Sequence, residues 1–308
     1  MENRFTNDFF SPSAILSNLS RNVALHLGTP SLRVNVGIDD AMRKLHRILN
    51  IDINDPRTTW PRAKFQVLKP ALHEDSDGNP VHLILLLGAV FLFFLSKETR
   101  SSRALWGYSA ALSAGFLLFC ALLKWQPWNS RLQLPLFVLA APFVAAVFCK
   151  RWNERFVLAI ALALLLSALP WLLFNRSRSL IGNPNVWNRN RFEQYFTNRP
   201  QIRDAYLGAA DFLKSKNCRR IGLEVGPNDW EYPLWPLLKA GNETIPIEHV
   251  HVQNRSALLI LSGFSPCAIL STGIDPPEEL ATEAGTYTKK WASGPITVFL
   301  RQSQPGVP

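Results

Sequence analysis

Four apolar segments follow one another in the middle of this chain and constrain its fold more than any other feature. They occupy residues 81–95, 104–123, 132–149 and 156–174. The last three contain no formal charge and approach the roughly 20 residues that a helix needs to cross about 30 Å of hydrocarbon. The first is shorter and would need flanking residues to span. Four such segments in a row predict a polytopic α-helical membrane bundle with four spanning helices, because buried core helices of a soluble protein rarely occur in this arrangement.

The distribution of charge fits a membrane topology better than binding to nucleic acid. The formal net charge is +10, and residues 81–175, the most apolar block, contain eight basic and two acidic side chains. Most of the basic excess therefore belongs to the membrane block. A nucleic-acid-binding protein would instead present its basic residues on a soluble face, with aromatic side chains between them.

Basic connectors predict which ends of the helices face the cytoplasm. The connectors 96–103 and 150–155 each carry three basic residues, whereas the intervening connector 124–131 carries two. The positive-inside rule places the two more basic connectors in the cytoplasm. We therefore expect a multi-pass protein of the inner (plasma) membrane, with the connector 124–131 on the outer face.

The chain then divides into three parts. Residues 1–80 are predicted to form an extracytoplasmic loop with short helices, 81–175 the four-helix transmembrane block, and 176–308 an extracytoplasmic α/β domain in which strands alternate with helices. An outer N-terminal region of this size normally follows a signal peptide or another span, and residues 1–30 lack the pattern of a signal peptide. The pattern suggests the C-terminal part of a longer polytopic protein.

Shorter patterns predict the elements on either side of the apolar block. Residues 11–27 carry apolar side chains at helical spacing, which is typical of a helix that lies on the membrane or packs against its neighbours, and residues 39–49 repeat the pattern. In the C-terminal part, strands are expected at 220–225, 247–252, 257–261, 268–271 and 296–301, and helices at 200–216 and 230–240. Asn228 or Asp229 would cap the second of these helices.

The connector between the second and third apolar segments has the composition of a binding site at the membrane surface. Residues 124–142 read KWQPWNSRLQLPLFVLAAP. The rings of Trp125 and Trp128 favour the headgroup level of a bilayer. Arg131 has a planar fork of donors that suits a pair of phosphate oxygens. The alternative is that Arg131 only extends to lipid headgroups, as basic residues near helix ends commonly do.

Other polar side chains of this connector are candidates for the same site. Gln126, Trp128 and Asn129 are candidate substrate-binding residues, and Lys124 is a second cation near Arg131. A plain connector would not need these residues, so we interpret the stretch as the mouth of a membrane-embedded site.

A second candidate cluster directly precedes the first apolar segment. Residues 72–80 read LHEDSDGNP. His73, Glu74 and Asp75 could supply a general base or a metal site at the membrane surface. The alternative is a solvated turn, because Asp-Gly and Asn-Pro are ordinary turn sequences.

The cysteines and the C-terminal histidines give weaker indications. Cys218 and Cys267 each precede a predicted strand, so an extracytoplasmic disulfide between them is a candidate, with two free thiols as the alternative. His249 and His251 share one face of a predicted strand, but two histidines without a third ligand are a weak indication of a metal. We therefore predict neither a metal nor a cofactor.

Taken in order, these motifs resemble the C-terminal half of bacterial integral-membrane glycosyltransferases of the GT-C class, whose relatives include protein O-mannosyltransferases and aminoarabinose transferases. The resemblance covers most of the chain, from the HED and GNP motifs through the basic connectors to Glu231-Tyr-Pro-Leu-Trp235. Arg131-Leu-Gln-Leu-Pro135, followed by Pro142, is similar to an element that lies near the lipid-phosphate end of the donor in this class.

The resemblance implies transfer of a sugar from a polyprenyl-phosphate donor to an acceptor on the outer face, with the donor and membrane lipid as partners. Arg131 and Lys124 would neutralise the departing phosphate, and a carboxylate would act as base toward the acceptor hydroxyl. Glu74, Asp75 and His73 are the catalytic candidates, although the principal acidic residues of this class lie in an upstream loop, on a missing N-terminal half. The alternatives are a non-catalytic membrane scaffold and a component of a transporter for lipid-linked sugars.

Overall fold

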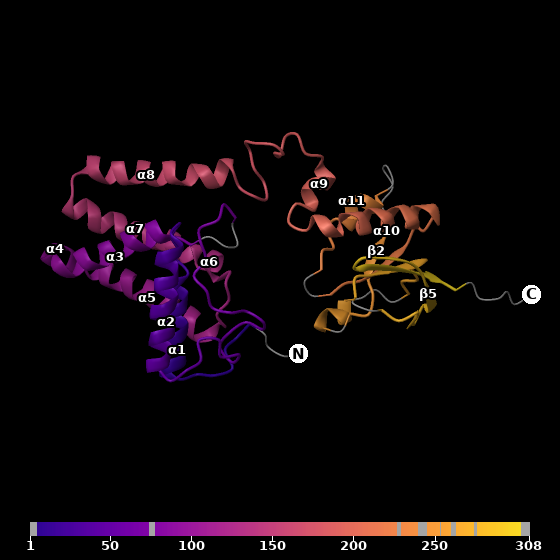
Figure 1. Cartoon of the computed structure of the whole chain (residues 1–308), viewed down its shortest axis with the longest axis horizontal. Coiled ribbons are helices and arrows are strands. Elements are labelled where there is room, and N and C mark those ends of the chain that lie inside the picture. The colour runs from indigo at the N-terminus through magenta and orange to yellow at the C-terminus, as the bar shows by residue number, and fades with distance from the viewer. Residues whose placement is uncertain are drawn as a thin grey trace, which may run out of the picture. The chain divides into compact units, whose positions relative to one another are not determined.

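The computed structural model describes residues 5–73, 78–226, 229–239, 245–252, 254–259, 263–273 and 276–302. The chain divides into two compact units, Met1–Gly182 and Asn183–Pro308. The first is helical, and the second combines helices with a β-sheet (Figure 1). The mixed fold class is therefore present, and the N-terminal loop packs with the apolar helices as one unit.

Four apolar helices form the centre of the first unit. They are α3 (Pro80–Leu95), α5 (Arg103–Leu122), α7 (Leu134–Arg151) and α8 (Glu154–Leu173). Among the described helices, α5, α7 and α8 are long and apolar enough to cross a membrane, whereas α3 has 16 residues and is shorter. Every described residue of α8 is exposed or half-buried although the helix is strongly apolar, as expected of a helix surrounded by lipid. Three helices of spanning length thus indicate a membrane protein.

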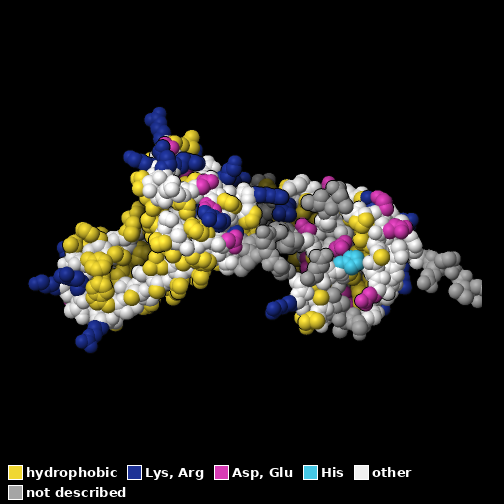
Figure 2. Space-filling view, turned by 90° about the horizontal axis from the view of Figure 1, so that it is seen from below, with side chains coloured by type: hydrophobic (Ala, Val, Ile, Leu, Met, Phe, Trp, Pro, Cys, Tyr) yellow, Lys and Arg dark blue, Asp and Glu magenta, His cyan; other side chains and the backbone are white. Residues whose placement is uncertain are grey.

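The apolar helices pack around α3 and α7. Phe93 of α3 lies against Phe143 of α7, with ring centroids 5.6 Å apart. The two basic connectors lie at the same end of this bundle, because Lys150 Nζ is 3.9 Å from Glu98 Oε1 in the short helix α4 (Lys97–Arg100). Figure 2 shows the apolar surface of this unit, with Lys and Arg side chains at its periphery.

The N-terminal helix α1 (Pro12–Ala24) packs on the opposite end of α5, and α2 (Leu32–Ile48) packs on α1. Ser11 caps α1 by accepting a hydrogen bond from the backbone N–H of Ala14 at 3.1 Å. α2 begins seven residues before the predicted residue 39. Contrary to the simplest interpretation of its apolar spacing, α1 buries a largely polar face, while Leu16 on the other face is exposed.

The second unit begins with short helices and continues as a mixed sheet. Its elements are α9 (Arg191–Tyr195), η1 (Pro200–Ile202), α10 (Arg203–Ser215), β1 (Ile221–Glu224), α11 (Leu234–Leu238), β2 (Ile247–His249), η2 (Arg255–Leu259), β3 (Ala268–Ser271), β4 (Glu279–Thr282), β5 (Gly285–Ser293) and β6 (Ile296–Arg301). The strand order is β2-β1-β3-β6-β5-β4, and β2, β1 and β3 are parallel to one another. The hydrophobic core lies between this sheet and helices α10 and α11.

Several local predictions for this unit are wrong. The predicted strand at 257–261 is occupied in its described part by the 3₁₀-helix η2. Pro233, rather than Asp229, precedes α11, and the Asp229 carboxylate instead accepts a hydrogen bond from the Gly226 N–H at 2.9 Å. The hairpin of β4 and β5 was not predicted, because β5 is interrupted by a register shift between Lys289 and Trp291 that breaks the strand alternation.

A disulfide joins Cys218 and Cys267, the pair that the sequence suggested, with Cα atoms 5.7 Å apart. The two cysteines lie just before β1 and β3, which are adjacent parallel strands. The disulfide therefore fixes the amino ends of these two strands.

Candidate functional site

An apolar cavity of about 240 Å³ lies between α3, α5 and α7, and His26, just after α1, lies at its edge. Leu86, Val90, Phe116 and other apolar side chains form most of its wall. Among the described lining residues, the polar ones are His26, Ser109, Ser113 and Gln133. A cavity of this size and lining favours a hydrocarbon ligand over water, which requires several polar partners.

A second apolar cavity of about 230 Å³ lies between α3, α7 and α8. Leu86, Phe137 and Ala140 line both cavities, so the contact between α3 and α7 forms the wall between them. His82 lines the second cavity, and its ring centroid is 6.2 Å from that of Phe137. The unit thus offers two adjacent spaces for hydrocarbon on either side of one helix pair.

Buried polar side chains close one end of the first cavity. His26 Nε2 is 2.7 Å from Gln133 Oε1, and Gln133 Nε2 donates to Asn22 Oδ1 at 2.7 Å. Asn129 Nδ2 donates to the same Asn22 oxygen at 3.0 Å. The backbone N–H of Asn79 donates to His26 Nδ1 at 3.1 Å, so Nε2 carries the imidazole proton and donates to Gln133. The chain of hydrogen bonds therefore requires a neutral imidazole.

Burial lowers the pKa of His26, and also that of His46 in α2. His46 Nε2 is 2.8 Å from Ser17 Oγ, and its Nδ1 is 2.8 Å from the carbonyl oxygen of Met42, which again suits a neutral ring. Both imidazoles titrate near 6.5 in the unfolded chain. The unfolded state therefore binds more protons than the folded state below that pH.

We expect the helical unit to lose stability as the pH falls through about 6.5, because the folded-state pKa values are lowered. The apparent melting temperature of the protein in lipid nanodiscs, followed by circular dichroism between about pH 7.5 and 5.5, measures this loss. Replacing His46 by glutamine should make the loss shallower. Replacing His251 in the second unit should leave it unchanged. A melting temperature that does not fall over this range would contradict the assignment of neutral rings.

The polar face of α1 also holds the end of α5. Asn18 Nδ2 donates to the carbonyl oxygens of Cys120 and Leu123 at 3.0 and 3.3 Å, and Asn7 Nδ2 donates to Ala121 O at 2.7 Å. The last carbonyls of a helix have no intrahelical partner. These asparagines supply that partner, and so they fix the point from which the connector to α7 starts.

Arg21 is the centre of this polar face and is fully buried. Its Nη1 donates to Ile53 O and to Thr59 Oγ1, both at 2.7 Å, and its Nη2 donates to Asn18 Oδ1 and to Thr58 Oγ1. These acceptors are all neutral. Burial lowers the pKa of Arg21 to about 9, since the charged form is removed from water.

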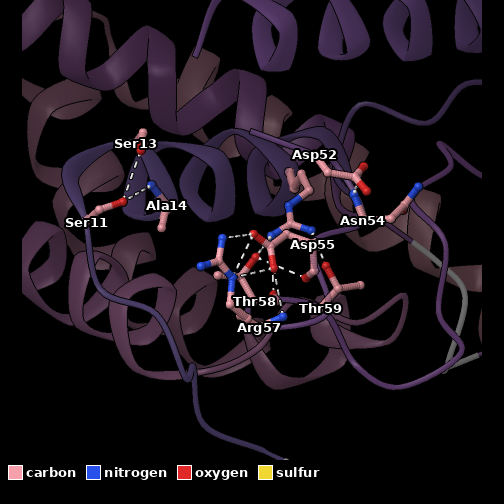
Figure 3. A network of polar contacts seen from close by, with 10 residues as sticks. Ser11, Ser13, Ala14, Asp52, Asn54, Asp55, Arg57, Thr58 and Thr59 are labelled. Carbon is pink, nitrogen blue, oxygen red and sulfur yellow. Dashed lines mark hydrogen bonds and ion pairs between the residues drawn. The ribbon is translucent and has the colours of Figure 1, made fainter. Parts of the chain in front are cut away.

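The loop that supplies these acceptors is braced by an ion pair, and Figure 3 shows Asp55 and Arg57 beside Thr58 and Thr59. Arg57 Nε and Nη2 donate to the two Asp55 oxygens at 3.0 and 2.7 Å. These hydrogen bonds lower the pKa of the Asp55 carboxyl. The loop is therefore fixed by Asp55 and Arg57 on one side and by Arg21 on the other.

The predicted residues of the connector 124–131 have different surroundings. Lys124 is buried, and its Nζ lies 2.5 Å from Asp8 Oδ2. Gln126 and Asn129 are also buried, and neither is among the described residues that line the cavity. Arg131 is exposed and belongs to the short helix α6 (Asn129–Leu132), two residues before Gln133.

One tryptophan of this connector does not lie at the membrane surface. Trp125 is fully buried, with its ring centroid 5.3 Å from that of Phe65 and with the Arg21 guanidinium 5.5 Å from its own ring centroid. The prediction that it marks the headgroup level is wrong, because it belongs to the core between the N-terminal loop and the connector. Trp128 is half-buried, 6.3 Å from the ring of Trp60.

The predicted catalytic carboxylates Glu74 and Asp75 lie outside the described residues. His73 is half-buried, and its backbone N–H donates to Ala71 O at 2.7 Å. The neighbouring Leu72 carbonyl accepts a hydrogen bond from the Arg176 N–H at 2.8 Å. The segment at Leu72 therefore lies beside the segment that follows α8.

The residues that the sequence interpretation missed are Asn22, His26 and Gln133. The signal for Asn22 was the helical spacing of Asn18, Arg21 and Asn22, which places three polar side chains on one face of α1. No local pattern indicated the contact between His26 and Gln133. In the second unit, His249 and His251 each pair with a glutamate, and the described residues contain no group of three or more side chains suited to a metal ion.

No protein-family model, curated protein or solved structure matches this chain in the comparisons made with each. Function is therefore inferred from the geometry of the site.

Proposed function

We propose that this chain forms the C-terminal part of an integral-membrane glycosyltransferase of the GT-C class, which transfers a sugar from a polyprenyl-phosphate donor to an acceptor on the outer face of the inner membrane. The observation that carries this proposal is an apolar cavity among apolar helices, two of which are of membrane-spanning length, and its polar end adjoins the connector with Arg131. A polyprenyl phosphate consists of a long hydrocarbon chain and one anionic end, which correspond to the apolar wall and the polar end of the cavity.

The walls of the cavity support the hydrocarbon part of this proposal. An isoprenoid chain that enters the cavity would gain contacts with Leu86, Val90 and Phe116, which otherwise face empty space. The polar end, with Gln133 and His26, would stop the chain and leave its head at the level of α6.

Arg131 is the proposed partner of the donor phosphate. Its guanidinium can form two parallel charge-assisted hydrogen bonds with phosphate oxygens, and it is exposed on α6. Lys124 was a second candidate, but its side chain is buried, with its ammonium beside Asp8. We therefore assign Lys124 the role of holding the connector, and Arg131 that of counter-charge.

The catalytic base is proposed to come from the segment before α3. Glu74 and Asp75 stand a few residues before Asn79, whose backbone N–H bonds to His26 at the polar end of the cavity. A carboxylate near that point would accept the proton of the acceptor hydroxyl while the sugar leaves the phosphate. In the class that the sequence resembles, an upstream loop supplies the principal acidic residues.

The proposed orientation puts the polar end of the bundle and the second unit outside the cytoplasm. The two basic connectors lie together at the other end of the bundle, as the positive-inside rule requires of a cytoplasmic end. The disulfide between Cys218 and Cys267 fits an oxidising compartment. α3 would be a fourth, shorter span.

A second candidate is binding of a lipid-linked sugar without transfer, as in a transporter component or a membrane scaffold. It is favoured by the lining of the two cavities, because none of their described residues is a carboxylate. Product formation from undecaprenyl-phosphate sugars separates the two candidates, since a transporter component or a scaffold would bind the donor and release it unchanged.

Replacing Arg131 by alanine is expected to weaken binding of undecaprenyl phosphate by about ten- to a hundredfold, the value of a lost bidentate contact with a charged group. Affinity for the uncharged polyprenol should change little, because the hydrocarbon contacts remain. Native mass spectrometry of the protein in phosphatidylcholine nanodiscs measures both affinities.

A matched pair of serine variants tests the cavity in the same assay. Ser113 lines the cavity on α5, so Ser113→Trp should fill it and weaken binding of both lipids. Ser167 is exposed on α8 and lines neither cavity, so Ser167→Trp should leave binding unchanged.

For the Arg131 experiment, equal affinity of the wild type and of Arg131→Ala for undecaprenyl phosphate would remove Arg131 from the mechanism.

A further inference from the structure

Two large aromatic side chains stay exposed on the second unit although a hydrophobic core is close by. The Tyr232 side chain is 60% exposed and that of Trp235 is 40% exposed. Both belong to the EYPLW sequence at the start of α11. The next residues inward, Leu234 and Leu238, are buried against the sheet. The helix is thus anchored by its leucines and presents its aromatic rings outward.

The exposed rings are held in place by neighbouring side chains. The Tyr232 ring packs edge-on against Tyr195 of α9, with centroids 5.3 Å apart and planes at 84°. Trp235 Nε1 donates to Glu231 Oε1 at 3.0 Å. Pro233 is buried between them and fixes the backbone at the start of α11. A ligand would therefore meet a surface that is already ordered.

The carboxylate of Glu231 is oriented by two donors at the edge of these rings. Its Oε1 accepts from Trp235, and its Oε2 lies 3.0 Å from His249 Nε2. A carboxylate offers about four lone-pair positions, so two positions stay available for a ligand. The Glu231 side chain is 34% exposed, which leaves these positions accessible.

This surface suits a neutral polyhydroxylated ligand better than a lipid or a charged polymer. A hydrocarbon would bury the Glu231 carboxylate without hydrogen bonds, which is costly. A charged ligand of either sign would be attracted by one of these groups and repelled by the other, because Glu231 is an anion and Arg191 and Arg199 are cations. Arg191 Nε donates to Tyr195 Oη at 2.8 Å, and the Arg199 guanidinium lies 5.3 Å from the Trp230 ring centroid.

We propose that the surface formed by Tyr232, Trp235 and Glu231 binds a carbohydrate. The apolar face of a sugar ring stacks on the aromatic side chains, and two of its hydroxyl groups donate to the Glu231 carboxylate. In the proposed transferase, on which this part of the inference rests, the bound carbohydrate is the acceptor rather than the lipid-linked donor.

Saturation-transfer-difference NMR tests this binding directly, with maltotriose and chitotriose as probes. The full protein is kept in phosphatidylcholine nanodiscs, because detergents with sugar headgroups would occupy the surface. We expect transfer from the protein to the ring protons of at least one trisaccharide. Absence of transfer to both sugars would overturn the proposal.

Variants of the surface give the expected size of the effect. Tyr232→Ala should weaken binding about tenfold through the loss of ring stacking, and Glu231→Gln about tenfold through the loss of a charged acceptor. Trp187 is 80% exposed in the same unit, so Trp187→Ala is the matched control and should bind like the wild type. Equal losses in Trp187→Ala and Tyr232→Ala would overturn the proposal.

The outcome is separable from that of the proposed transfer. Sugar binding without affinity for undecaprenyl phosphate would support this surface and remove the transferase. Binding of undecaprenyl phosphate without binding of either sugar would keep the proposed transferase and remove the carbohydrate surface. In a working transfer assay, Tyr232→Ala should raise KM for the acceptor and leave KM for the donor unchanged. A rise in the donor KM alone would contradict the assignment of the acceptor.

Discussion

Replacing Arg21 by methionine is expected to lower the unfolding free energy of the helical unit by about 3 kcal/mol. Methionine fills much of the same volume but donates no hydrogen bond. The oxygens of Ile53, Thr59, Asn18 and Thr58 would then lose their common donor inside the fold. Each buried polar atom left unsatisfied costs about 1–3 kcal/mol, and the gain from no longer burying a charge offsets part of the sum.

Arg21 also positions the candidate site, so its loss should reach beyond stability. Asn18, which accepts from Arg21, donates to the last carbonyls of α5. The connector that carries Arg131 starts at that helix end. We therefore expect the methionine variant to bind undecaprenyl phosphate less tightly even at temperatures where it remains folded.

Two further variants define the cause of this loss. Arg21→Lys keeps the charge but lacks the planar fork, and it should recover only a small part of the stability. Arg43 is exposed on α2, so Arg43→Met should change the unfolding free energy by less than about 0.5 kcal/mol. Thermal unfolding in nanodiscs, followed by tryptophan fluorescence, measures all three. A methionine variant as stable as Arg43→Met would show that the buried guanidinium does not hold the loop.

The sequence predicted the apolar helices closely because their boundaries are set by hydrophobic length. Their ends in the structure lie within about two residues of the expected ones. β3 and β6 begin and end where expected, since each is a short, mostly apolar run that follows a proline within two residues and is followed by a polar residue.

The polar face of α1 could not be predicted from the same rule. Amphipathic spacing identifies two faces of a helix but does not say which one meets the protein. In a soluble protein the apolar face is buried, whereas beside lipid the apolar face can point outward. Leu16 is exposed on α1, while Asn18 and Arg21 are fully buried. The contacts with α5 and with the loop around Thr58 decide this orientation.

The surroundings of the candidate site residues could not be predicted from the sequence. Gln133, which follows the connector, lines a cavity, whereas Lys124 and Asn129 are buried and bonded to Asp8 and Asn22. Residue types at a connector indicate polar chemistry there, but burial decides which side chains reach a ligand. His26 comes from a segment about a hundred residues away in sequence, so its contact with Gln133 was not visible in any local pattern.

Removing the disulfide of the second unit is expected to have the largest effect on that unit. Cys218 and Cys267 are 49 residues apart, and closing a loop of this length lowers the entropy of the unfolded chain by the equivalent of about 4 kcal/mol. The double variant Cys218→Ser and Cys267→Ser should therefore unfold at a clearly lower temperature. The loss should appear in the sheet, where β1 and β3 begin beside the bond.

Cys149 is the matched control for this experiment, because it is exposed and not part of a disulfide. Cys149→Ser should leave the melting temperature unchanged, and adding a reductant should lower the wild type to the temperature of the double variant. The presence of the disulfide in the cell also bears on topology, because a disulfide forms and persists outside the reducing cytosol. Maleimide labelling measures it. If both Cys218 and Cys267 react with maleimide in intact membranes without a reductant, the second unit lies in a reducing compartment, and the outer-face orientation of the proposed transferase is wrong.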